Sequence, residues 1–216
     1  MATVITIDGA AGSGKSTLAR AMALALGLPY VNTGLMYRAL ALRAHRGGVS
    51  PDDAPALERL ARELRFELDR SVRPPELRID GAPPDASLTT PEVESNVSAV
   101  ARHPEVREVL RAEQRRLAAD GAVMEGRDIG TVVAPDAPLK LFLEAHPKER
   151  ADRRALERED EPSRIAEALG TRDELDARTN PLEPAPDAVV LDTTGLAPGD
   201  VVRRALELVR RRGVSA

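Results

Sequence analysis

Apolar and polar positions follow one another along this chain as short buried strands and amphipathic helices would. Runs of mainly apolar residues with the length of buried strands lie at 4–8, 29–32, 122–125, 139–144 and 187–192, and the first of them is rich in β-branched side chains. Stretches with helical spacing of apolar residues lie at 18–26, 33–44, 105–119, 147–161 and 200–212. Because strands and helices alternate at both ends of the chain, we expect an α/β fold in three layers, with a parallel sheet between helices.

The middle of the chain breaks this alternation. Residues 65–68 and 76–80 alternate between apolar and polar side chains, and proline-rich segments lie beside them. We interpret this part as a small antiparallel sheet in an inserted lobe. The expected units are a core of residues 1–32, 108–147 and 165–216, an inserted lobe of residues 33–107, and a short helical lid of residues 148–164.

A glycine-rich segment joins the first expected strand to the first expected helix. It reads Gly9-Ala10-Ala11-Gly12-Ser13-Gly14-Lys15-Ser16-Thr17 and matches the phosphate-binding loop pattern G-x-x-x-x-G-K-S. Glycines let successive N–H groups turn toward phosphate oxygens, and the helix N-terminus adds partial positive charge. Lys15 is expected to reach the β- and γ-phosphates of ATP, and Ser16 to bind Mg²⁺, partly through water. The strand and the helix around the loop argue against a chance glycine-rich turn.

Composition narrows the class of protein. The net charge is −4 and aromatic residues make up 2% of the chain, which argues against binding of a nucleic-acid polymer. The absence of cysteine excludes disulfides and thiolate catalysis and fits a cytoplasmic enzyme. No apolar run approaches the roughly 18 residues of a membrane span, so we expect no membrane association. We also expect a monomer.

Two groups of charged residues lie where phosphate chemistry would need them. Arg127 and Asp128 directly follow an expected strand, and ligands of open α/β sheets bind at the carboxyl edge. The expected helix 147–161 carries Arg150 and Arg154 four residues apart, a spacing that is unfavourable for like charges unless an anion meets them. A solvated helix face with ion pairs is the alternative to a phosphate-binding lid.

Segments from end to end of the chain resemble the bacterial cytidylate kinase family, a branch of the nucleoside monophosphate kinases. The segments that carry the resemblance are 5–9, the phosphate-binding loop, Thr33-Gly34-Leu35-Met36-Tyr37-Arg38, 125–133, 135–138 and 191–194. The family also has an enlarged monophosphate-binding lobe with a small antiparallel sheet. The resemblance therefore implies a P-loop kinase core, this lobe between residues 33 and 107, and transfer of the ATP γ-phosphoryl group to CMP or dCMP.

The resemblance also implies roles for individual residues. Those expected to bind CMP are Thr33, Tyr37, Arg38, Ser98, Arg107, Arg127, Asp128, Arg172, Asp176 and Arg178. Those expected at the lid are Arg150, Arg153 and Arg154, with Arg153 on the ATP side. Lys15, Arg127, Arg150 and Arg154 would neutralise the transferring phosphoryl group. Ser98, Arg107 and Asp128 offer the donors and acceptor that match the Watson–Crick edge of cytosine.

This chain departs from the family pattern in two places. Asn32 and Thr33 stand where the family commonly has aspartate and serine, so a hydroxyl is kept and a charge is lost. We expect Thr33 to cap the helix that follows. The stretch between Asp176 and Pro181 is shorter than usual, and Arg178 is the best match for a family arginine there.

Other functions remain open from the sequence. A phosphate-loop GTPase would need a guanine-reading N-K-x-D motif, which the chain lacks. A kinase for UMP, another nucleotide or a shikimate-like acceptor would share everything but the acceptor pocket. A non-catalytic nucleotide-binding module would explain the loop but not the arginines that follow several separate strands.

Overall fold

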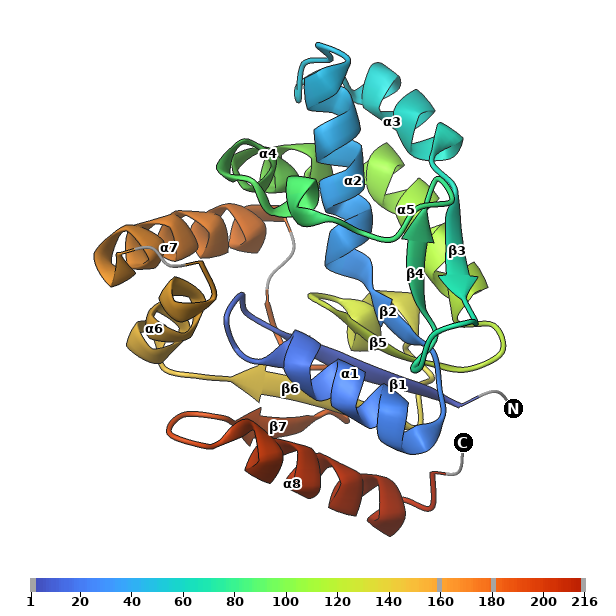
Figure 1. The fold of residues 1–216 in the computed structure, drawn as a ribbon, viewed down its shortest axis with the longest axis vertical. Coiled ribbons are helices and arrows are strands. Elements are labelled where there is room, and N and C mark those ends of the chain that lie inside the picture. The colour runs from blue at the N-terminus through green and yellow to red at the C-terminus, as the bar shows by residue number, and fades with distance from the viewer. Residues whose placement is uncertain (1–2, 159–160, 180–181, 215–216) are drawn as a thin grey trace.

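The computed structural model describes residues 3–158, 161–179 and 182–214, which form one seven-stranded sheet with helices on both faces (Figure 1). The strand order is β3-β4-β2-β5-β1-β6-β7. The strands are β1 (Val4–Gly9), β2 (Tyr30–Asn32), β3 (Phe66–Asp69), β4 (Glu76–Ile79), β5 (Ala122–Gly126), β6 (Leu139–Glu144) and β7 (Val189–Asp192). All neighbouring strands are parallel except β3 and β4, so the expected three-layer α/β architecture is confirmed.

The central strand β1 lies between β5 and β6 in register. Asp8 pairs with Gly126 on one side and with Phe142 on the other. The carboxyl ends of β1, β5 and β6 therefore meet at one edge of the sheet. Loops that follow these strands are brought together there, which is where open α/β sheets bind ligands.

Each face of the sheet has its own apolar core. Helices α1 (Lys15–Leu26) and α8 (Pro198–Arg211) cover one face, where Ile5, Ile7 and Leu141 are buried. The helices that enclose the opposite core are α2 (Thr33–Arg46), α3 (Ala54–Glu63), α4 (Pro91–Ala101) and α5 (Pro104–Leu117). This second core runs without interruption from Met124 on β5 to Leu57 on α3.

The antiparallel pair expected in the inserted lobe is present, but it is not a separate sheet. Strands β3 and β4 pair from Phe66↔Ile79 to Asp69↔Glu76, and β4 joins β2 through Tyr30↔Glu76. The N–H of Tyr30 also donates to the carbonyl of Pro75 at 2.8 Å. The lobe is thus a continuation of the edge of the main sheet, a pairing between distant strands that local alternation does not reveal.

Two helices lie beside the phosphate-binding loop (Figure 1). Helix α6 (Pro147–Arg158) falls within the expected lid, and α7 (Pro162–Thr179) continues from it. Their shared core is small and consists of Ala151, Ala155, Ile165 and Leu169, with Ala11 of the loop packed against it. Most of the segment expected to form a lid, residues 148–164, thus lies on α6, which packs against the loop.

Helix ends follow local capping rules with one correction. Asn32, not Thr33, is the N-cap of α2, because its Oδ1 accepts from the N–H of Leu35 at 3.2 Å. Thr33 is the first helical residue, and its hydroxyl donates to the carbonyl of Glu125 at 2.7 Å. Among the helices that the structure describes, none is long and apolar enough to cross a bilayer.

Candidate active site

Three glycines shape the phosphate-binding loop, and two of them have no room for a side chain. Gly9, Gly12 and Gly14 all have positive φ, at 145°, 76° and 93°. A Cβ on Gly9 would lie 2.4 Å from the carbonyl oxygen of Leu143, and one on Gly12 would lie 2.7 Å from that of Arg150. The loop is therefore packed directly between the end of β6 and helix α6.

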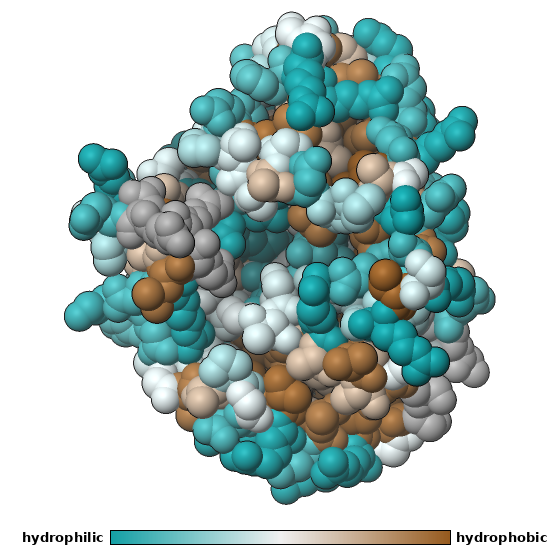
Figure 2. Space-filling model, viewed as in Figure 1, coloured by the Kyte–Doolittle hydropathy of each residue, from teal (hydrophilic) through white to brown (hydrophobic). Residues whose placement is uncertain are grey.

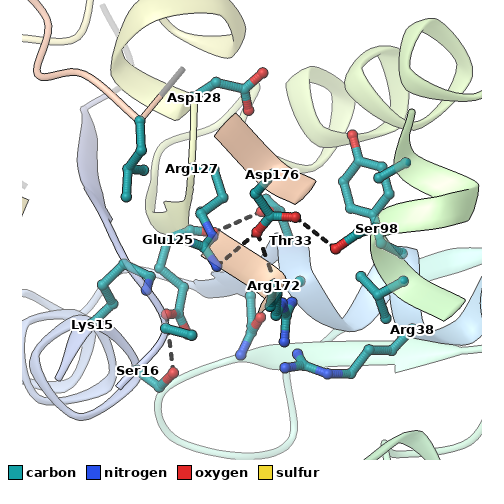
Figure 3. Close-up of a pocket in the computed structure, with 18 of the residues that line it drawn as sticks. Lys15, Ser16, Thr33, Arg38, Ser98, Glu125, Arg127, Asp128, Arg172 and Asp176 are labelled. Carbon is teal, nitrogen blue, oxygen red and sulfur yellow. Dashed lines mark hydrogen bonds and ion pairs between the residues drawn. The ribbon is translucent and has the colours of Figure 1, made fainter. Parts of the chain in front are cut away.

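Lys15 and Ser16 open α1 and face the acceptor side of the site (Figure 3). The ammonium of Lys15 donates to the carbonyl of Ala10 at 2.6 Å. The hydroxyl of Ser16 donates to the buried carboxylate of Glu125 at 3.0 Å, and the hydroxyl of Tyr30 donates to its other oxygen at 2.5 Å. Glu125, at the end of β5, therefore ties the loop to the rest of the sheet edge.

One pocket joins the loop to the predicted acceptor side. Figure 2 shows it as a hydrophilic hollow in the middle of this face of the molecule. Of the residues predicted from the sequence, those that line it are Ala11, Gly12, Lys15, Ser16, Thr33, Tyr37, Arg38, Ser98, Arg107, Arg127, Asp128, Arg154, Arg172 and Asp176. They come from the loop, β5 and helices α2, α4, α5, α6 and α7, so the fold gathers distant segments around one space.

Two carboxylates pair with arginines that line the pocket. Glu94 pairs with Arg38 and Arg172, each at 2.9 Å. Asp176 pairs with Arg127 at 2.8 Å and accepts a hydrogen bond from Ser98 at 2.7 Å (Figure 3). The pocket is lined by both signs of charge, which reduces the repulsion among guanidinium groups that lie close together.

The guanidinium group of Arg127 has N–H donors that can bind a further acceptor. Within the described chain, neither of its terminal nitrogens has an aligned acceptor, although Asp176 and Asp173 lie 2.8 Å and 3.7 Å away. Its side chain is only 21% exposed. Buried donors of this kind are costly unless a ligand satisfies them, so Arg127 is suited to an anion that enters from the pocket.

The far end of the pocket carries the residues predicted to read the base. Arg107 on α5 donates to the carbonyl of Thr179 at 3.1 Å. Asp128 forms an ion pair with Arg111, one turn further along α5, and not with Arg107. Both side chains are thereby held in place, and Arg111 is a site residue that the sequence analysis missed.

The two other arginines expected at the lid do not line the pocket. Arg150 donates to the carbonyl of Ala11 at 3.1 Å and pairs with Asp173 at 2.7 Å. Arg153 donates to the carbonyl and hydroxyl oxygens of Thr193 at 2.6 Å and 3.1 Å. Arg150 therefore joins α6 to the loop, and Arg153 joins α6 to the segment that follows β7.

Asp8 fixes the segment that follows Arg127 and Asp128. Its carboxylate accepts from the N–H groups of Ile129 at 2.9 Å and Gly130 at 2.7 Å. Those residues begin a short π-helical turn, Ile129–Val133. Burial raises the pKa of Asp8 to about 6, and the two N–H donors oppose that rise.

Comparison with known proteins identifies the family of this chain. The family model for cytidylate kinase matches residues 5–211. A cytidylate kinase of Desulfitobacterium hafniense is 44% identical over 94% of this chain and 91% of its own length. The chain belongs to the cytidylate kinase family. Another cytidylate kinase, from Solibacter usitatus, is 42% identical over 97% of this chain and 93% of its own length. The crystal structure of TT1252 from Thermus thermophilus covers all of both chains with 23% identity and a TM-score of 0.51, and shares the fold.

Of the residues predicted to bind CMP, Arg178 alone does not line the pocket. It is exposed on the last turn of α7. The carboxylates Glu94, Glu125 and Asp173 were missed, since a single acidic residue on a helix or strand carries no distinctive signal. Arg111 could have been found, because it lies four residues after Arg107 on one face of α5.

We expect ATP binding to be coupled to protonation of Lys15, and the coupling to depend on pH. Burial, followed by the nearby Arg127 guanidinium, lowers the pKa of Lys15 to about 7. At pH 8 the free protein then holds Lys15 mostly neutral, whereas nucleotide phosphates favour the ammonium. ATP binding at pH 8 should therefore take up about one proton. Calorimetry in two buffers of different ionisation enthalpy measures this uptake, and the permanently charged Lys15→Arg variant should show none. Equal uptake in both proteins would contradict the assignment.

Proposed function

We propose that this chain transfers the γ-phosphoryl group of ATP to CMP or dCMP, giving CDP or dCDP and ADP. The observation that carries the proposal is a single pocket lined at one end by Lys15 and Ser16 and at the other by Arg38, Arg127 and Arg172. Phosphoryl transfer depends mainly on positioning and charge neutralisation. A pocket with cations on both sides of the transfer point meets that requirement.

The donor end would hold the ATP phosphates. N–H groups of the loop and the start of α1 point toward anions, and Lys15 would neutralise charge on the β- and γ-phosphates. Ser16 Oγ and the Glu125 carboxylate, 3.0 Å apart, offer oxygen ligands beside the loop. That suits Mg²⁺, which keeps several waters and needs only one or two protein ligands beside the phosphates. When bound, Mg²⁺ would neutralise charge that develops between the β- and γ-phosphates.

The acceptor end would hold the monophosphate. Arg127, with unsatisfied donors, and Arg38 would bind the phosphate of CMP, whose oxygen is already an anion and needs no general base. Arg150 and Arg154 lie four residues apart on α6, and Arg150 contacts the loop. Both would close over the transferring group, which excludes water. Water excluded in this way cannot accept the phosphoryl group in place of CMP.

A panel of acceptors tests the proposal. ADP formation should be measured with ATP and CMP, dCMP, UMP, AMP or shikimate, and without acceptor as a control for ATP hydrolysis. CMP and dCMP should give the highest kcat/KM, and AMP and shikimate should stay at the level without acceptor. A higher kcat/KM with UMP, AMP or shikimate would assign a different acceptor. Binding of ATP without turnover of any acceptor would indicate a non-catalytic nucleotide-binding module.

A further inference from the structure

Glu94 occupies a position among the arginines that a substrate phosphate would be expected to take. It lies in the first turn of α4, and its side chain is 15% exposed. Its Oε1 lies 2.9 Å from Arg38 Nε on α2 and 3.3 Å from Arg154 Nη2 on α6. Its Oε2 lies 2.9 Å from Arg172 Nη1 on α7. One carboxylate thus joins cations from three helices.

These three cations would be costly to hold together without an anion. Arg38, Arg154 and Arg172 are between 13% and 24% exposed, so solvent screens their mutual repulsion only partly. A carboxylate and a phosphate offer guanidinium groups the same kind of acceptor oxygens. The carboxylate of Glu94 can therefore meet this demand in the empty pocket, and a phosphate can meet it in the occupied one.

We propose that Glu94 is a built-in substitute for substrate phosphate, which gathers the arginines in the empty protein and is displaced from them when phosphate binds. The inference rests on the proposed function, in that Arg38 and Arg154 are taken to meet substrate phosphates. Its consequence is competition: an arginine held by Glu94 is less available, so the apparent affinity for phosphate is lower than the arginines alone would give.

The same carboxylate links parts of the molecule that must move relative to one another. Helices α2 and α4 belong to the second core, whereas α6 and α7 have their own small core beside the loop. Glu94 lies on α4 and Asp176 on α7, and Arg172 of α7 pairs with both, at 2.9 Å and 3.8 Å. Exchange of Glu94 for phosphate would therefore change the contacts between α4 and α6–α7 at the moment of binding.

Removal of the charge tests the competition. Binding of CMP, cytidine and pyrophosphate should be measured by calorimetry for the wild type, Glu94→Gln and Glu94→Ala. The control is Glu92→Gln, the same charge change on an exposed residue of the same helix. Loss of the competing charge should lower the Kd of CMP and the Kd of pyrophosphate at least threefold. The Kd of cytidine, which has no phosphate, should stay unchanged. Glu92→Gln should match the wild type.

The outcomes separate this inference from the proposed function. If both Glu94 variants bind CMP more weakly relative to cytidine, Glu94 orients the arginines for phosphate and does not compete with it. If the ratio of CMP affinity to cytidine affinity is unchanged, Glu94 has neither role. Either of these two results would overturn the inference. The alanine variant avoids a buried amide, so the result does not depend on glutamine being tolerated. Failure of the wild type to phosphorylate CMP would instead refute the proposed function, and pyrophosphate binding would still test Glu94.

Discussion

Replacement of Lys15 by alanine is expected to lower kcat by about 10² to 10³, the range found when one charge-stabilising contact is lost. Lys15 faces the pocket at the start of α1, and among the three lysines of the chain it is the one in the phosphate-binding loop. Its ammonium is the cation placed to neutralise charge that builds up on the donor phosphates. Turnover should be measured with saturating ATP and CMP.

The fold should survive this substitution. The hydrogen bond that Lys15 donates goes to a carbonyl of the same loop, so its loss breaks no contact between distant segments. Thermal unfolding should therefore stay close to that of the wild type. Lys148→Ala, which removes an exposed lysine near the start of α6, serves as the matched control and should keep normal turnover. Normal turnover in Lys15→Ala would show that the loop does not act on the donor phosphates.

The second large effect concerns the choice of base. Asp128→Ala and Arg107→Met should each lower the CMP/UMP ratio of kcat/KM at least about tenfold, which corresponds to roughly 1.4 kcal/mol. An ionised Asp128 accepts from the amino group of cytosine, and Arg107 donates to its ring nitrogen or carbonyl. Uracil would set a carbonyl against the carboxylate and an N–H against the guanidinium, and buried polar mismatches are costly.

The surroundings of both residues support this assignment. Arg111 pairs with Asp128 and orients its carboxylate, and the Thr179 carbonyl accepts a hydrogen bond from Arg107. Asp136→Ala and Arg204→Met remove the same kinds of side chain at exposed positions and should leave the ratio unchanged. Equal losses of activity on CMP and UMP in the two test variants would mean that neither residue distinguishes the bases.

Features that depend on local spacing were predictable from the sequence. The phosphate-binding loop was recognised because its glycines, Lys15 and Ser16 stand at fixed offsets between a strand and a helix. A site at the carboxyl edge of the sheet was predicted because Arg127 and Asp128 directly follow a buried strand. In both cases the chemistry and the element that positions it are neighbours in the chain.

Features that depend on pairing between distant residues were not predictable from the sequence. The sequence could not show that β4 joins β2, because that contact is between residues 30 and 76. It also could not show that Asn32 both caps α2 with its oxygen and donates with its amide to the Tyr30 hydroxyl at 3.2 Å. An ionised aspartate at this position could accept but not donate. The departure from the family pattern at position 32 thus has a physical counterpart in the structure.

The unequal size of the apolar cores has a consequence for cohesion. The core that joins β5 to α3 is continuous, so the inserted lobe and that face of the sheet share the same buried side chains. Such a unit resists being split, because separation would expose a single apolar interior to water. The apolar core between α6 and α7 consists of two alanines, one isoleucine and one leucine, and polar contacts to the loop and to Glu94 add to it. Local opening costs least where few apolar contacts are lost, so we expect α6 and α7 to open more readily than the helices around the larger core.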